Sequence, residues 1–445
     1  MTGPEAEPSA GGTRAAHGAI EAVWRIESAR LIAGLVRMVH DVGLAEDAAA
    51  DALVAALEQW PAAGVPENPG AWLMTIAKRK AIDAVRRRVA LDRKYGEIAV
   101  EIEHRLGAAD PEPDEVEDDL LRLMFVACHP VLSSEARVAL TLRLLGGLTT
   151  EEIARAFLVP EPTIGQRIWR AKRTLADADV GFEVPDGVER AQRLASVLEV
   201  IYLIFNEGYS ATAGDQWIRR DLCVEALRLG RILAALTPRD AEVHGLLALM
   251  EIQASRLRAR TAPDGSPIRL VDQDRGRWDH LQIRRGLAAL DEAERRSGMR
   301  LAAALRIGGD GTPGPYTLQA AIAACHARAR SVDETDWPRI ATLYDVLARV
   351  TPSPIVELNR AVAVAMAYGP EAALPLVDAL ADDPSMRGYH LLPSVRGDLL
   401  ARLGRGEEAS VEFTHAATLT RNVRERELLL DRAAAVVDTE DVDNT

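Results

Sequence analysis

The stretch TTEEIARAFLVPEPTIGQRIWRAKRTL, Thr149–Leu175, carries the clearest structural pattern in this chain of 445 residues. Thr149 or Thr150 can cap a first helix, and Glu152 is placed to complete a capping box. This helix is expected to end at the residues that follow, Val159, Pro160 and Pro162. The apolar residues at helical spacing, expected on buried faces, are Ile153, Ala154, Phe157, Ile164, Ile168 and Leu175. Two short helices across a tight turn, the second from about Thr163, predict a helix-turn-helix.

The opposite face of the second helix is equipped to contact DNA. Arginine pairs with guanine edges, glutamine pairs with adenine, and both lysine and arginine hold phosphates, so such a face suits the major groove. The residues predicted to bind DNA there are Thr163, Gln166, Arg167, Trp169, Arg170, Lys172 and Arg173. The alternative interpretation is a basic helix that is only solvated.

A second candidate DNA-binding segment lies upstream, in the last of three helical blocks between Ile20 and Arg88. The blocks read IEAVWRIESARLIAGLVRMVHDV, LAEDAAADALVAALEQW and AWLMTIAKRKAIDAVRRR, and each has apolar residues at helical spacing. Proline and glycine in PAAGVPENPG predict a constrained loop before the third block. From this block onward runs a cluster of basic residues: Lys78, Arg79, Lys80, Arg86, Arg87, Arg88, Arg93 and Lys94.

Trp72 and the PENPG loop stand at the start of this basic helix. A stiff loop beside a positive groove is suited to hold an unstacked base and its strand. Two plainer alternatives stay open, in which the basic run is a solvated face and Trp72 belongs to the core.

The bulk composition indicates a mostly helical protein with at least two domains. The formal charge of −14 argues against binding nucleic acid or an anionic membrane through the whole surface, but it permits a local basic surface. Cys128, Cys223 and Cys325 form no CxxC pair, which speaks against a disulfide framework and fits a reducing cytoplasm. The chain shows no signal peptide at its start and no apolar run long enough to cross a bilayer.

The sequence indicates no enzyme activity, metal or cofactor. The pairs Cys128–His129 and Cys325–His326 lack the spacing that places two ligands on one helical face. The glycine-rich GGDGTPGPYT lacks the GK[ST] ending of a phosphate loop. One polar cluster has two open interpretations, a small-molecule site or helix caps and buried hydrogen bonds: Asn206, Glu207, Tyr209 and Asp215.

The chain from about residue 185 onward is expected to be helical, with breaks at Thr261–Asp274 and Gly308–Pro315. Two stretches, WPRIATLYDVLARVTPSPIVELNRAVAVAMAYGPEAALPLVDAL and GYHLLPSVRGDLLARLGRGEEASVEFTHAATL, each have the pattern of a helix, a turn and a helix. A recurrence at about 34 residues, with small residues where helices approach closely, is typical of tetratricopeptide-like arrays.

On these motifs, residues 20–180 resemble the extracytoplasmic-function group of the sigma-70 family, which are bacterial transcription-initiation factors. AEDAAADALVAALEQW is similar to the family's helix that docks on the largest subunit of core RNA polymerase, which implies interface roles for Glu46, Asp47 and Asp51. NPGAWLMTIAKRKAIDAVRRR is similar to the −10 segment, and PENPG to the loop that captures a flipped base. The −10 contacts that this match implies are Asn68, Trp72, Lys78, Arg79, Asp83, Arg86 and Arg87. The helix-turn-helix resembles the family's reader of the −35 element.

Three positions depart from the family's usual pattern. Ala50 stands where relatives place a polar polymerase contact, Arg79 where asparagine is usual, and Gly165 where a basic residue commonly meets the −35 element. The promoter sequence therefore cannot be transferred from relatives.

The C-terminal part resembles a group of sigma factors with a fused tetratricopeptide-like extension. The segments that carry this match are VIYLIFNEGYSAT, LVDQDRGRWDH and GPYTLQAAIAACHA. The loop PDGSP, whose last four residues are Asp264–Pro267, is similar to a short Asp-Gly motif of that group, with Ser266 in place of a glycine.

Together these features predict an all-α protein: two small helical sigma domains, the second a helix-turn-helix, and then a large helical, tetratricopeptide-like domain. The expected parts are a flexible leader (1–19), sigma region 2 (20–90), a linker (91–115), sigma region 4 (116–180), a helical extension (185–310), tetratricopeptide-like repeats (311–437) and a disordered tail (438–445).

The predicted function is promoter recognition as a cytoplasmic sigma factor whose partners are core RNA polymerase and promoter DNA. The extension would regulate or support activity, through a protein partner or an intramolecular contact. One rival is a helix-turn-helix regulator that acts without core polymerase. Another is an enzyme with its site near Glu207 and Asp215, although no recognisable reaction follows from the sequence.

Overall fold

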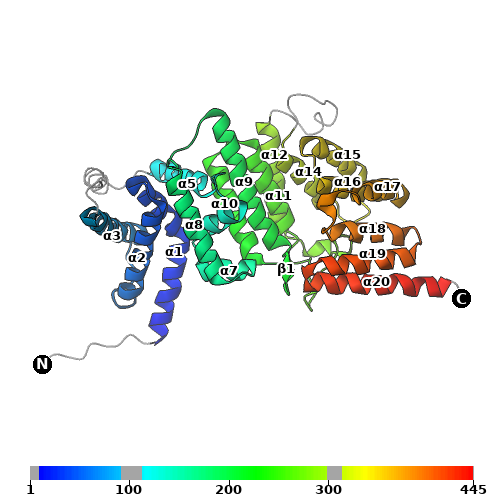
Figure 1. The fold of residues 1–445 in the computed structure, drawn as a ribbon, viewed down its shortest axis with the longest axis horizontal. Helices are drawn as coiled ribbons and strands as arrows, with labels where there is room; N and C mark the ends of the chain where they lie inside the picture. Colours follow the sequence, from blue (N-terminus) through cyan, green and yellow to red (C-terminus); the bar gives the residue numbers. More distant parts are fainter. Residues whose placement is uncertain (1–9, 92–112, 298–312, 444–445) are drawn as a thin grey trace. The chain divides into compact units, whose positions relative to one another are not determined.

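The computed structural model describes residues 10–91, 113–297 and 313–443 (Figure 1), and the described chain is almost entirely helical. It divides into two compact units, Met1–Ile201 and Tyr202–Thr445. The predicted all-α fold is therefore confirmed. The predicted linker at 91–115 falls almost wholly outside the described residues.

The first unit holds the two predicted sigma domains. Its helices are α1 (Ala10–Val39), α2 (Val42–Ala63), α3 (Pro69–Leu91), α5 (Pro113–Ala127), α6 (Ser134–Leu144), α7 (Thr150–Phe157), α8 (Glu161–Asp177) and the first part of α9 (Gly187–Tyr209). Helix α1 begins ten residues before the predicted start at Ile20. Part of the predicted leader is therefore helical, since the alanines of this stretch favour a helix.

The proline-rich loop between α2 and α3 is fixed at both ends. Helix α2 ends at Gly64, whose φ of 85° is a conformation that residues with a Cβ rarely adopt. At the other end Asn68 Oδ1 accepts a hydrogen bond from the Ala71 amide at 3.1 Å, and Pro69 is the first residue of α3. The rings of Trp60 and Trp72 meet edge to face with centroids 5.3 Å apart, which joins the two helices beside the loop.

The helix-turn-helix forms as its capping pattern predicts. Thr149 Oγ1 accepts from the Glu152 amide at 3.1 Å, and Glu152 Oε2 accepts from the Thr149 amide at 2.8 Å, which completes the capping box. Leu158 turns the chain in the left-handed conformation with φ 51°. Helix α8 begins at Glu161 rather than near Thr163, because proline is tolerated in the first turn of a helix.

The second unit continues with helices and two short strands. Its elements after α9 are β1 (Ala213–Gly214), α10 (Arg220–Leu236), α11 (Ala241–Ala254), η2 (Leu270–Asp272), η3 (Arg275–Arg277), α12 (His280–Arg296), α14 (Pro315–Arg328), α15 (Trp337–Val350), α16 (Pro354–Tyr368), α17 (Pro370–Leu380), η4 (Pro384–Met386), α18 (Leu391–Arg402), α19 (Gly406–Leu419), β2 (Arg421–Asn422) and α20 (Val423–Asp443). The predicted break at Thr261–Asp274 is confirmed, whereas the one at Gly308–Pro315 lies mostly outside the described residues.

Consecutive helices of this unit pack against one another; the first predicted helix–turn–helix stretch spans α15, α16 and α17, and the second spans α18 and α19. The pairs α15–α16, α17–α18 and α19–α20 begin at Trp337, Pro370 and Gly406, close to the expected recurrence of about 34 residues. Their buried side chains form successive small cores, one between α16, α17 and α18 and the next between α18, α19 and α20. The predicted disordered tail is wrong at its start, since α20 continues to Asp443.

One buried asparagine ties the last pair of helices to the start of this unit. Asn422, which is 1% exposed, donates from Nδ2 to the carbonyl oxygens of Ala211 at 3.1 Å and Gln216 at 2.9 Å. Its Oδ1 accepts from the amides of Arg424 and Glu425 and thereby caps α20. The clasp joins segments that lie some two hundred residues apart in the sequence.

Replacing Asn422 with alanine is expected to destabilise the protein by about 2–3 kcal/mol, because two buried carbonyl groups lose their donor and α20 loses its cap. Urea unfolding followed by circular dichroism measures this change. Arg421→Ala, at the exposed neighbouring position, is the control and should shift the midpoint little. Equal losses of stability in the two variants would contradict a stabilising role for the Asn422 hydrogen bonds.

Candidate nucleic-acid interface

Helix α8 presents its predicted DNA-binding face to solvent. Ile164, Ile168 and Leu175 are buried as predicted, together with Ala171. On the opposite side the exposed residues are Thr163, Gln166, Trp169, Arg170 and Arg173. Trp169 is 58% exposed, and the Arg173 guanidinium lies 5.6 Å from its ring centre. This face therefore offers both an aromatic ring and arginines to a partner.

Two members of the predicted set, Arg167 and Lys172, are only half-buried rather than exposed. Arg167 lies close enough to Glu135 of α6 to help lower the pKa of that carboxyl, after the hydrogen bonds from the Glu135 amide and Ser133. Lys172 turns away from the exposed face and forms an ion pair with Glu46 of α2.

The basic helix α3 exposes four of its predicted DNA contacts: Arg79, Asp83, Arg86 and Arg87. Arg87 Nε donates to the carbonyl of Asp83 at 3.2 Å, one helical turn away. Lys78 is half-buried, whereas Asn68 is exposed in the loop although its side-chain oxygen caps α3. The side chains of Arg88, Arg93 and Lys94 lie outside the described residues.

Trp72 is half-buried, so its surroundings fit in part a core residue and in part a residue that could meet an unstacked base. It packs edge to face on Trp60, which is 2% exposed and belongs to the core. The remaining surface of Trp72 is open beside the fixed loop. The ring is thus held in position without being enclosed.

The three residues matched to polymerase docking have different surroundings. Asp47 and Asp51 are exposed on α2, and the Asp51 carboxylate lies 4.0 Å from Lys80 Nζ. Glu46 is buried and pairs with two cations from the other predicted domain, Arg143 of α6 at 2.6 Å and Lys172 of α8. We call Glu46, Arg143 and Lys172 the ion cluster.

The electrostatics of the ion cluster favour the charged carboxylate. Burial on its own raises the pKa of Glu46, but the charges of Lys172 and Arg143, and their hydrogen bonds, outweigh it and lower the pKa below the usual 4.5. Arg143 also donates to the Leu148 carbonyl at 3.1 Å, just before the capping box of α7. The sequence analysis missed Arg143, since its partner Glu46 lies 97 positions away and no local motif links them.

Further contacts hold α1 against the predicted second domain. Arg37 Nε lies 2.9 Å from the Asp119 carboxylate, whose side chain is 2% exposed. Gly147, with φ 66°, approaches α1 so closely that an added Cβ would stand 2.9 Å from Ser28 Oγ. The two predicted sigma domains therefore pack together through ion pairs and close backbone contact.

Comparisons with known proteins match both predicted sigma domains. The family model of sigma-70 region 2 matches residues 26–90, and that of sigma-70 region 4 matches residues 122–175. The sigma factor SigK of a Mycobacterium species, an extracytoplasmic-function RNA polymerase sigma factor, is 31% identical over 160 residues, which cover 34% of this chain and 77% of that relative. The chain belongs to the extracytoplasmic-function group of the sigma-70 family.

The sigma factor carries an additional C-terminal region beyond these matches. Residues 193–294 match a family of unknown function, DUF6596. An uncharacterized protein of Rhizobium meliloti is 43% identical over 413 residues, 90% of this chain and 92% of the relative. The probable extracytoplasmic-function sigma factor SigI of Mycobacterium tuberculosis is 26% identical over 39% of this chain, a match that covers 60% of that relative. No solved structure matches the chain.

The described residues contain neither a candidate membrane-spanning helix nor a candidate metal-ligand cluster. No described helix is both long and apolar enough to cross a membrane. Within the same ranges, no group of three His, Cys, Asp or Glu side chains is placed to hold a metal ion.

The ion cluster predicts a pH dependence of stability. Because the folded pKa of Glu46 is lower than 4.5, its contribution is fully present at pH 7 and is lost as the pH falls below 4.5 through the folded value. Glu46→Gln should therefore destabilise the first unit by about 3 kcal/mol at pH 7 and by less near pH 3. Urea unfolding at the two pH values measures the difference.

The matched control is Asp47→Asn, the exposed neighbour on the same helix, which should change stability little at either pH. A destabilisation by Glu46→Gln that is equal at both pH values would show that the charge of Glu46 does not contribute.

Proposed function

We propose that this sigma factor reads the −35 promoter element with the exposed face of α8 and the −10 element with α3 and its loop. The observation that carries the proposal is the capped helix-turn-helix of region 4, whose second helix buries one apolar stripe and exposes Gln166, Trp169 and Arg170. Phosphate contacts by its arginines fix the position on DNA, and side chains at base edges give the specificity. Asp47 and Asp51 on α2 are proposed to dock on core RNA polymerase.

Strand opening in this proposal needs no catalytic group. The loop before α3 is stiff, and Trp72 stands at its end with one edge against Trp60. Such a preformed edge can receive an unstacked base at little cost in conformational entropy, and the binding energy offsets the loss of base stacking. Asn68 and Trp72 are proposed as the residues that meet the opened strand.

The ion cluster supports a further step, in which regions 2 and 4 separate before promoter binding. Positions −10 and −35 lie about 25 base pairs apart, which is on the order of 80 Å along the DNA. A lysine of α8 that is paired with α2 cannot reach DNA at such a distance from the −10 segment. We therefore propose that the packed arrangement is a closed state, and that Glu46 becomes available to polymerase only when the cluster opens.

The C-terminal unit is proposed to regulate or support transcription, by binding a protein partner or by an intramolecular contact. Its support is the stack of helix pairs, since such arrays form extended binding surfaces. The assay below distinguishes this proposal from the rival of an operator-binding regulator. A sigma factor must form a complex with core polymerase to start transcription, whereas such a regulator acts without that complex. The enzyme rival places its site near Glu207 and Asp215, but Glu207 is engaged in an ion pair with Arg219.

Arg170→Ala is expected to reduce −35-dependent transcription about 10-fold or more, since a good arginine contact to a base contributes roughly 1–3 kcal/mol. The assay combines the full-length protein, core RNA polymerase and genomic promoter fragments and quantifies defined transcripts. Co-purification with core polymerase should be unchanged.

The matched control is Arg349→Ala, an exposed arginine on α15 outside the DNA-binding helices. Loss of core binding in Arg170→Ala would contradict the assigned role. If the wild-type protein forms no complex with core polymerase and no start site depends on it, the proposed function is lost.

Arg143→Gln is expected to favour the open state, because it removes one of the two cations that hold Glu46. The affinity for a −35 promoter fragment, measured by fluorescence anisotropy, should rise by up to about 10-fold as the closed population falls. Arg349→Gln is the control. Unchanged affinity in a variant that keeps its helical circular dichroism would show that the cluster does not limit DNA binding.

A further inference from the structure

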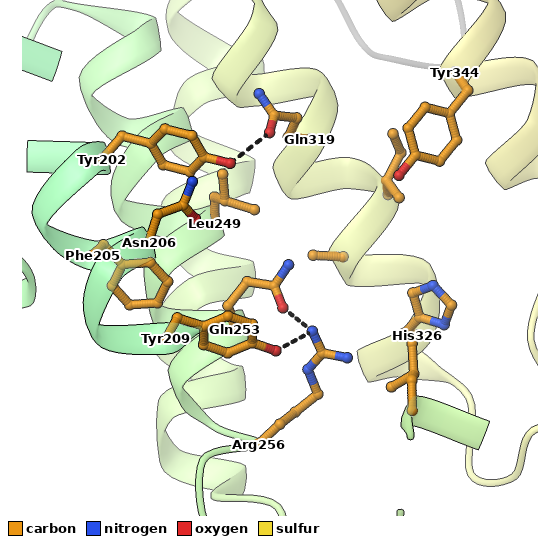
Figure 2. A pocket seen from close by; sticks show the side chains of 13 residues that line it. Tyr202, Phe205, Asn206, Tyr209, Leu249, Gln253, Arg256, Gln319, His326 and Tyr344 are labelled. Carbon is orange, nitrogen blue, oxygen red and sulfur yellow. Dashed lines mark hydrogen bonds between the residues drawn. The ribbon is translucent and has the colours of Figure 1, made fainter. Parts of the chain in front are cut away.

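The second unit contains a cavity of about 230 Å³ between α9, α11, α14 and α15. This is roughly the volume of seven or eight waters in the liquid, at about 30 Å³ each, and so it suits a small molecule. Figure 2 shows Tyr202, Asn206 and Tyr209 on one side, with His326 and Tyr344 across the space from them. The cavity lies in or beside the part of the chain that matches a family of unknown function.

The lining of this cavity carries one positive charge, that of Arg256, because His326 is neutral at pH 7. The lining residues include Arg256 and His326 and contain no aspartate or glutamate. Arg260 and Arg275 do not line the cavity, but their charges lie close to groups that do. Arg260 interacts electrostatically with Arg256, and Arg275 with His326. In the described part of the chain, none of these three arginines forms an ion pair; Glu334 acts on Arg275 only at longer range.

Arg256 is the cation that reaches the cavity. It is 8% exposed, and it donates to the Tyr209 hydroxyl at 2.7 Å and to the Gln253 side-chain oxygen (Figure 2). Its Nε is buried without a hydrogen-bond partner, and so is Nδ1 of His326. Both atoms therefore retain hydrogen-bonding capacity in a place where it is costly to leave unused.

Aromatic rings offset only part of this cost. The Arg256 guanidinium lies 5.8 Å from the Tyr209 ring centre and 5.7 Å from that of Trp278, and Arg260 lies 3.5 Å from that of Tyr209. Such contacts stabilise a cation but leave its charge in place. Burial, followed by the charges of Arg256 and Arg275, lowers the pKa of His326 to about 3, as expected where positive charge is not neutralised.

The remaining lining combines apolar surface with neutral hydrogen-bonding groups. Phe205, Leu249 and Ile322 supply apolar surface, and Tyr202 donates to Gln319 Oε1 at 3.2 Å. A cavity with one buried cation, neutral polar groups and apolar walls is complementary to a small molecule with one negative end.

We propose that this cavity binds a small organic carboxylate, whose negative group pairs with Arg256 while its apolar body lies against Phe205 and Leu249. The ligand would supply the missing counter-charge for the Arg256 guanidinium, which has no aspartate or glutamate among the lining residues. The inference concerns binding alone, so it stands or falls independently of the proposed roles in transcription.

The test uses the full-length protein without polymerase or DNA. Isothermal titration calorimetry measures the binding of acetate, succinate and benzoate, with benzamide as the neutral counterpart of benzoate and inorganic phosphate as a second anion. At least one carboxylate should bind with a dissociation constant in the millimolar range or below, and benzamide at least 10-fold more weakly than benzoate if benzoate is that ligand.

Arg256→Gln should weaken carboxylate binding at least 10-fold, whereas Arg258→Gln, an exposed arginine two residues along the chain, should leave it unchanged. Because Arg256→Gln can disturb folding, a second variant, Ala323→Leu, fills the cavity and keeps every charge; it should also abolish binding while the circular dichroism spectrum is retained.

Four results would overturn the proposal. They are binding by none of the three carboxylates, binding by phosphate alone, equal binding by benzoate and benzamide, and equal carboxylate affinity of folded Ala323→Leu and wild type.

Discussion

The carboxylate of Glu46 is buried between Arg143 and Lys172, and this ion cluster sets the arrangement of the first unit. An unpaired carboxylate in that position would be strongly unfavourable, so α2 remains packed while α6 and α8 supply the two cations. The ion pair of Arg37 with Asp119 and the close approach at Gly147 bring α1 into the same packing. Region 2 and region 4 thereby form one compact body.

The ion cluster also divides the basic face of α8 into residues that remain exposed and one residue that is engaged in an ion pair. Trp169, Arg170 and Arg173 remain exposed on α8 while Lys172 is engaged with Glu46. Most of the proposed recognition face is therefore exposed, although the helix that carries it is held against region 2. In the proposed closed state, access to the promoter would depend on the cost of opening an ion pair rather than on rebuilding a binding surface.

The buried charge of Arg256 in the second unit has different surroundings from that of Glu46. Glu46 in the first unit has two cations as partners, whereas Arg256 has aromatic rings, a tyrosine hydroxyl and an amide oxygen. Aromatic faces stabilise the guanidinium without cancelling its charge. The polar cluster around Asn206 and Tyr209, which the sequence left open between a ligand site and simple hydrogen bonding, lines the cavity, while Glu207 is turned to Arg219.

The sequence by itself determined the helices and which of their faces are exposed, because capping boxes, prolines and apolar spacing act within a few residues. The capping box at Thr149, the exposed face of α8 and the fixed loop at Asn68 follow from such local patterns. The start of α1 and the extent of α20 were misjudged, since glycine and acidic residues weaken a helix locally without ending it. Only the tertiary structure decided that Glu46 meets Arg143 and Lys172 and that Asn422 clasps Ala211. These pairs are distant in the chain, and burial of their polar groups depends on how the helices pack.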